Sequence, residues 1–124
     1  AIAKKNRATQ TRLEKVLSYT KQTMVVYMSE EDLNRLCAYI VEYSSGDTIQ
    51  KISPVKVDSQ LKSIDIMHFG WNIGKAFSKK RIHTATFIKN VFAHTLRDLE
   101  ISTIERKMSH TESACYIKLK KEIT

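Results

Sequence analysis

The stretch from residue 59 to residue 77 restricts the fold of this chain most, because apolar side chains occupy nearly every azimuth of its predicted helix. Such a helix must lie at the centre of a domain and be covered on several sides. Gly70 and Gly74 each lower helix propensity by about 1 kcal/mol relative to alanine, so a close helix crossing is the natural reason for both. The apolar residues of the stretch are Leu61, Ile64, Ile66, Met67, Phe69, Trp71, Ile73 and Phe77.

Four further helices are predicted from apolar residues at three- and four-residue spacing and from capping residues. The first begins near residue 9. The second follows the N-cap Ser29 and ends at Gly46, and the fourth runs from the cap Thr84 to about residue 99. A short fifth helix follows Ser102, which forms a capping box with Glu105.

Three short segments favour β-structure: residues 24–28, 48–57 and 115–119, the last with strict apolar and polar alternation. A lone strand is unstable, so these segments should pair with one another. The sequence therefore predicts a mainly α fold, a compact bundle of four to five helices with a small two- or three-stranded sheet or hairpin. We expect the 124-residue chain to form a basic flexible arm at 1–8 and a single helical domain at 9–124.

The positive charge is unevenly distributed. The net charge is +8; residues 1–28 hold six bases and one acid, residues 29–58 three bases and six acids, and residues 59–107 nine bases and four acids. Between Ile66 and Arg97 stand six bases and no acid. A polyanion should therefore meet the basic ends and avoid the helix after Ser29, although many soluble domains are simply basic.

The helices at 59–77 and 84–99, joined by a basic turn at 78–83, resemble a helix-turn-helix pair, whose second helix reads the major groove of duplex DNA. The six-residue turn without glycine departs from the usual three or four residues. Charge reversal at Lys79, Lys80 and Arg81 in this turn should abolish polyanion binding with little change in stability, since a surface turn holds few buried contacts. The predicted nucleic-acid-binding residues are Lys75, Lys79, Lys80, Arg81, Thr86, Lys89, Asn90 and Arg97.

Two other surfaces bear on this prediction. A solvated basic helix face is the ordinary explanation for Lys89 and Arg97 taken singly. A C-terminal strand could add bases beside the nucleic-acid backbone, and those bases are Lys118, Lys120 and Lys121.

One short pattern bears on catalysis. His94 and Arg97, followed by His110 and Tyr116, resemble the His-x-x-Arg box, the later histidine and the nucleophilic tyrosine of the tyrosine recombinases. The resemblance covers only the last quarter of the chain, and both later intervals are shorter than in that family. It implies a degenerate recombinase-like enzyme, which is the lesser alternative.

We predict no catalytic residues, no metal and no cofactor, because the histidines and cysteines lack metal-ligand spacing and no phosphate loop is present. Trp71 and Phe69 could stack on unpaired bases, but aromatic residues in such a helix usually belong to the core. Cys37 and Cys115 fit a reducing, cytoplasmic setting, and no apolar run approaches the roughly 20 residues that span a bilayer.

The sequence thus favours a non-enzymatic nucleic-acid-binding domain, with duplex DNA as the main expectation. Such a domain would suit a regulatory, mobile-element or phage accessory protein. One alternative is a protein–protein interaction or homo-oligomerisation domain that uses the Gly70 and Gly74 face, and another is RNA binding. No membrane or small-molecule partner is expected.

Overall fold

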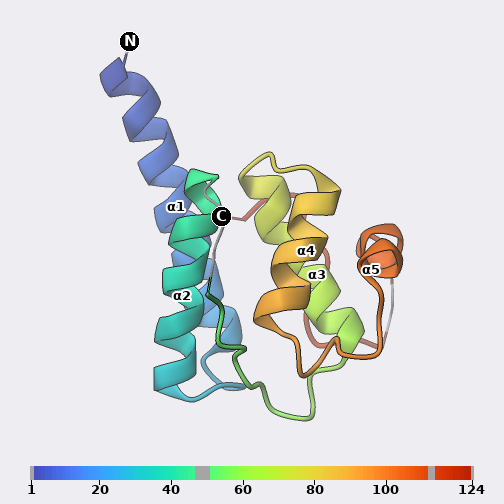
Figure 1. Cartoon of the computed structure of the whole chain (residues 1–124). Helices are drawn as coiled ribbons and strands as arrows, with labels where there is room; N and C mark the ends of the chain where they lie inside the picture. Colours follow the sequence, from blue (N-terminus) through green and yellow to red (C-terminus); the bar gives the residue numbers. More distant parts are fainter. Residues whose placement is uncertain (1, 47–50, 112–113, 124) are drawn as a thin grey trace.

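Helix α3 (Ser63–Ala76) runs through the middle of the molecule, as its all-round apolar pattern predicts (Figure 1). The computed structural model describes residues 2–46, 51–111 and 114–123, with side chains from Gln10 onward. The other helices are α1 (Ile2–Met24), α2 (Glu30–Ser45), α4 (Arg81–Val91) and α5 (Ile101–Lys107). Helix α3 contacts α1 and α4, and α4 also contacts α2 and α5. The mainly α prediction is confirmed.

The core surrounds one aromatic side chain of α3. Phe69 is fully buried, stacks on Tyr19 of α1 at 5.8 Å between ring centroids, and meets Phe92 edge-on at 6.0 Å. These contacts join the α1 side of the bundle to the end of α4. Phe69 is therefore core, as predicted.

The close helix crossing predicted from the two glycines is confirmed. A Cβ atom at Gly70 would lie 2.8 Å from Ile88 Cδ1 of α4, and one at Gly74 would overlap the side chain of Thr84. Real Cβ atoms do not approach other atoms so closely, because close-packed interiors leave no such room. The two missing side chains thus let α3 and α4 pack directly against each other.

Helix α2 has both of its predicted ends. The Ser29 hydroxyl accepts a hydrogen bond from the Asp32 N–H at 3.1 Å, and Gly46 adopts the left-handed conformation (φ 85°) at the C-terminal end. The glycine has no Cβ to oppose that φ. Local capping chemistry therefore fixes this helix.

The ends of α3, α4 and α5 differ from prediction, and α3 begins at Ser63 rather than near residue 59. Helix α4 begins after Lys80, three residues before the predicted start, and Thr84 lies inside it with its hydroxyl 2.6 Å from the Tyr43 hydroxyl. The link from α3 is therefore residues 77–80. Helix α5 begins after Glu100, so Ser102 is helical and is not its cap.

The predicted minor β element is wrong for the described residues, which contain no strand. Residues 51–58 are extended, but their backbone groups bond to helix side chains and to turns. Arg35 of α2 donates to the carbonyl of Pro54 at 2.9 Å, and the Asp58 N–H donates to the Tyr27 carbonyl at 2.7 Å. With their partners supplied in this way, these segments do not pair with one another. Residues 48–50 lie outside the described part.

Residues 116–121, here called the strap, lie along α3 and do not form a strand. Asp65 Oδ1 accepts from the N–H groups of Tyr116 (2.6 Å) and Ile117 (3.0 Å). The ring nitrogens of His68 lie 2.8 Å from the carbonyl of Ile117 and 2.7 Å from that of His110. One polar row of α3 therefore supplies the hydrogen bonds that a neighbouring strand would otherwise give.

The row continues to Asn72, one helical turn further along α3. Its amide nitrogen donates to the Lys118 carbonyl at 2.9 Å, and its oxygen accepts from the Lys120 N–H at 2.8 Å. Asp65, His68 and Asn72 are all buried. Together they hold the strap from Tyr116 to Lys120.

Helix α1 includes residues 2–8, where the sequence predicts a flexible arm, and the mobility of those residues stays a prediction. In the part of the chain that the structure describes, no helix combines the length and apolar character needed to cross a bilayer.

Candidate nucleic-acid interface

Arg81, predicted to contact phosphate, is bound within the protein. Its guanidinium donates to Ser109 Oγ at 3.0 Å and to the carbonyl of Glu105, and lies 5.0 Å from the centroid of the Trp71 ring. Carbonyls in the last turn of a helix lack intrahelical donors, and α5 ends at Lys107. Arg81 therefore ties the start of α4 to the end of α5.

Lys89 is also engaged by its own chain. Its ammonium donates to the carbonyls of Leu96 (2.7 Å), Leu99 (2.7 Å) and Arg97 (3.2 Å). An ammonium has three donors, so these contacts use all of them. Lys89 holds the turns that follow α4, which ends at Val91 and not at the predicted residue 99.

The other predicted residues do not converge on α4. Lys79 lies over the Tyr43 ring at 5.4 Å, and the Thr86 hydroxyl donates to the Ile82 carbonyl at 2.8 Å. Lys80 and Asn90 are exposed, but ten residues of helix separate them by about 15 Å. Arg97 is exposed beside Asp98, at 3.8 Å.

A second group of cations does converge, on a cavity of about 390 Å³ between α1, the end of α3 and the strap. We call this cavity the basic groove. Among the described residues that line it, Glu122 is the one acidic side chain. The five cations of the basic groove are Arg12, Lys15, Lys75, Lys120 and Lys121.

Local structure positions each of these side chains. Arg12 and Lys15 are three residues apart on α1 and so share a face, and Lys75 lies in the last turn of α3. Lys120 is placed by its bond to Asn72, which also lines the groove, and its ammonium lies 5.4 Å from the Tyr19 ring centroid. All five cations are exposed, so they can meet a ligand.

Asn72, which lines the groove, is bonded to a buried tyrosine behind it. Asn72 donates to the Tyr19 hydroxyl at 2.8 Å. Burial raises the pKa of Tyr19, against the lowering effect of its hydrogen bonds to Asn72 and Thr23, so the phenol stays neutral at physiological pH. The groove therefore gains no negative charge from below.

Of the eight residues predicted to bind nucleic acid, only Lys75 belongs to the basic groove, and Lys120 and Lys121 come from the segment predicted as a basic C-terminal strand. The signals for the others were the excess of bases in residues 1–28 and the three lysines of the supposed strand. Neither signal shows that the two ends of the chain meet.

Lys75 also lines a second cavity of about 270 Å³, here called the side hollow. Trp71, Lys79 and Arg81 line it too. The two cavities therefore adjoin at Lys75, and three of the predicted cations meet in the side hollow.

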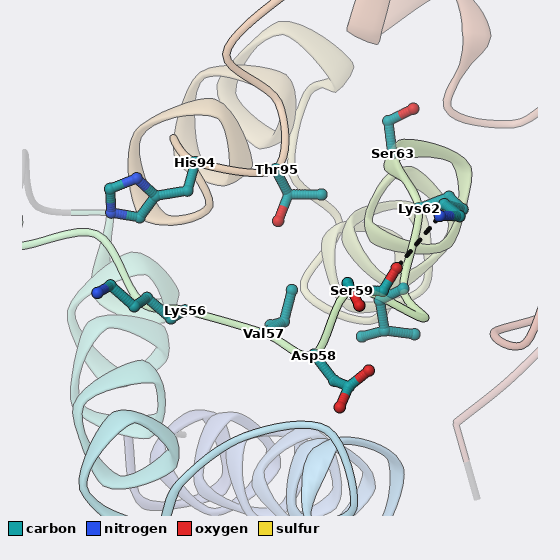
Figure 2. Close-up of a pocket in the computed structure, with 9 residues that line it drawn as sticks. Lys56, Val57, Asp58, Ser59, Lys62, Ser63, His94 and Thr95 are labelled. Atoms are coloured by element: carbon teal, nitrogen blue, oxygen red, sulfur yellow. Dashed lines mark hydrogen bonds between the residues drawn. The ribbon is translucent and has the colours of Figure 1, made fainter.

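A third cavity of about 480 Å³ lies between the 51–62 connector, the start of α3 and the turn after α4. His94 and Lys56 lie on one side, and Ser59 and Lys62 on the other, where the Lys62 ammonium donates to the Ser59 carbonyl at 3.2 Å (Figure 2). Asp58 Oδ1 accepts from the Gln60 N–H at 2.9 Å. These polar groups do not converge on one point.

The four residues of the recombinase-like pattern have separate surroundings. His94 lines the third cavity, Arg97 is beside Asp98, and the Tyr116 ring lies 6.3 Å from that of Tyr27. Among the described residues, no hydrogen bond or ion pair that the structure shows joins His94, Arg97, His110 and Tyr116 side chain to side chain.

No protein-family model, no curated protein and no solved structure matches this chain.

Proposed function

We propose that the chain is a non-enzymatic nucleic-acid-binding domain that holds phosphates in the basic groove. The observation that supports the proposal is the convergence of five exposed cations, with one acid, on a single cavity. These cations come from the two ends of the chain and from the end of α3. The proposal keeps the class of partner predicted from the sequence and moves its main binding surface away from α4.

Electrostatics favours a polyanion over a single small anion. Like charges that share a concave surface repel one another, and the concave shape strengthens the field. A row of phosphates relieves this repulsion and releases its own counterions. A partner with several linked negative charges therefore gains more than one with a single charge.

The face predicted for homo-oligomer contact, which carries Gly70 and Gly74, is covered by α4. Gly70 and Gly74 lie against Ile88 and Thr84 of α4, within the same chain. This face is buried and is not open to a second subunit.

The test replaces three exposed groove cations in one variant, Lys15→Glu, Lys75→Glu and Lys121→Glu. A labelled oligonucleotide should bind the parent with a log–log salt slope of about 3.5 to 4.5, from about 0.7 to 0.9 per phosphate for five contacts. The variant should bind on the order of 100-fold more weakly at low salt, with a slope below about 2.

The matched control is Lys51→Glu, Lys56→Glu and Lys107→Glu. All three are exposed and lie outside the groove, and both variants lower the net charge of +8 by six. The control should keep more of the parent's affinity than the groove variant. Equal losses in the two variants, or no binding by the parent at low salt, would refute the proposal.

A further inference from the structure

The side hollow adds a feature that phosphate binding does not require. Its wall holds Trp71, which is partly exposed, with the Arg81 guanidinium over the indole ring. The sequence favours a core position for this tryptophan, yet part of its surface faces the hollow. Arg81 cannot swing away freely, because Ser109 and the end of α5 hold it.

A fixed guanidinium over an aromatic ring offers unpaired bases a flat, cationic surface. Bases of single strands stack on aromatic side chains and on arginine planes, whereas bases of a duplex are paired and stacked on one another. At about 270 Å³ the hollow lies near the lower end of small-ligand sites, roughly 300–1,000 Å³, so it suits one base.

The position of the hollow links it to the basic groove. Lys75 lines both cavities, and Lys79 joins Lys75 and Arg81 as a third cation of the hollow. A strand with phosphates in the groove can therefore place a neighbouring base in the hollow across Lys75. A stiff duplex cannot send a base into this recess without unpairing it.

We infer that the ligand is a single-stranded nucleic acid, with its backbone in the basic groove and one base in the side hollow against Trp71 and Arg81. The inference rests on the proposed function and specifies the partner of the same site. It replaces the duplex expected from sequence, since Arg81 and Lys89 of α4 donate to protein carbonyls.

Trp71 is the single tryptophan of the chain, so its fluorescence reports directly on the hollow. The experiment titrates the whole chain with three probes: an oligothymidylate of about 12 nucleotides, a duplex of the same length, and heparin, a polyanion without bases. Anisotropy of labelled probes measures affinity, and tryptophan emission measures occupation of the hollow.

The oligothymidylate should bind on the order of 10-fold more tightly than the duplex and quench Trp71 emission, as stacking of one base implies. Heparin should bind without comparable quenching. A Trp71→Leu variant should lose about that factor for the oligothymidylate and keep its affinity for heparin. Quenching in the parent decides the question if this variant does not fold.

Two results would overturn the inference in different ways. If the duplex or heparin binds as tightly as the oligothymidylate and Trp71 emission stays unchanged, the base site is refuted and the phosphate-binding groove stands. If none of the three probes binds at low salt, the proposed function fails and the base site fails with it.

Discussion

The cations of α4 and those of the basic groove are the same residue types in the same basic chain, yet they have different partners. Arg81 and Lys89 donate to carbonyls at the ends of neighbouring turns. Lys75 and Lys121 are exposed around a cavity, together with cations from α1. The first set stabilises the fold, with the Arg81 guanidinium also lining the side hollow, and the second set is available to phosphates.

This contrast depends on carbonyl groups that lack donors. The turns after α4 and the last turn of α5 present carbonyls that the helices themselves do not use, and a long basic side chain nearby can satisfy them. The groove is bordered instead by side chains and by strap backbone that Asn72 already pairs. A run of bases in a sequence therefore marks a phosphate-binding surface only where the fold leaves those bases without backbone acceptors.

The largest loss of stability and of affinity should come from removing Asp65, which holds the strap on α3. Asp65→Ala removes the acceptor for the N–H groups of Tyr116, Ile117 and Lys62, and should lower the free energy of unfolding by about 3 kcal/mol. Because the strap carries Lys120 and Lys121, affinity for the oligonucleotide should fall as well. Urea denaturation and anisotropy measure the two effects.

Asp98→Ala is the matched control for this change. Asp98 is exposed, with Arg97 as a distant ionic neighbour at 3.8 Å, and its loss should alter stability by less than about 0.5 kcal/mol. An Asp65→Ala protein with unchanged stability and affinity would show that the strap does not depend on α3.

A smaller change in the free energy of unfolding should distinguish the cations of α4 from those of the basic groove. Arg81→Ala leaves the end of α5 without its donor and should lower the free energy of unfolding by about 2 kcal/mol, contrary to the expectation that this turn holds few contacts. Lys75→Ala should change it by less than about 0.5 kcal/mol and weaken oligonucleotide binding. Equal losses of unfolding free energy in urea would show that Arg81 and Lys75 do not differ in their contribution to the fold.

The smallest effect at neutral pH concerns Tyr43, which faces Thr84 and Lys79. Burial raises the pKa of Tyr43 from its usual 10.0 to about 12, and its hydrogen bond with Thr84 opposes the rise. The folded state therefore holds this proton more tightly than the unfolded state does. Stability should be independent of this group below about pH 10 and fall as pH rises from 10 to about 12.

The Tyr43→Phe variant provides the comparison for that titration. It should show a shallower decline of unfolding free energy over the same pH range, with part of the decline remaining because the pKa of Tyr19 is also raised. Chemical denaturation at a series of pH values measures both slopes. Identical slopes in parent and variant would contradict the assignment to Tyr43.

The sequence predicts the features that depend on near neighbours. Ser29 and Gly46 cap α2 as expected, and the central position of α3 follows from its own side chains. Thr84 has a side chain suited to capping, but it lies inside α4, where its hydroxyl bonds to that of Tyr43, a residue far away in the chain. Capping patterns alone cannot separate these two roles.

The strap was misassigned for a related reason. Alternating residues suit any extended segment with one buried side, whether its backbone meets a strand or the polar row of α3. The polar row was visible as Asp65, His68 and Asn72 in an otherwise apolar helix, but their partners are more than 40 residues away. For the site, Arg12 and Lys120 are even farther apart in the chain, so the sequence does not show that they meet Lys75 in one cavity.

The absence of side chains at Gly70 and Gly74 fixes how closely α4 packs on α3. Their contact with Ile88 and Thr84 sets the depth at which α4 lies on α3. A methyl group at Gly74 would push α4 outward and carry Arg81 away from Trp71, which remains on α3. The width of the side hollow is thus determined by two hydrogen atoms deep in the core.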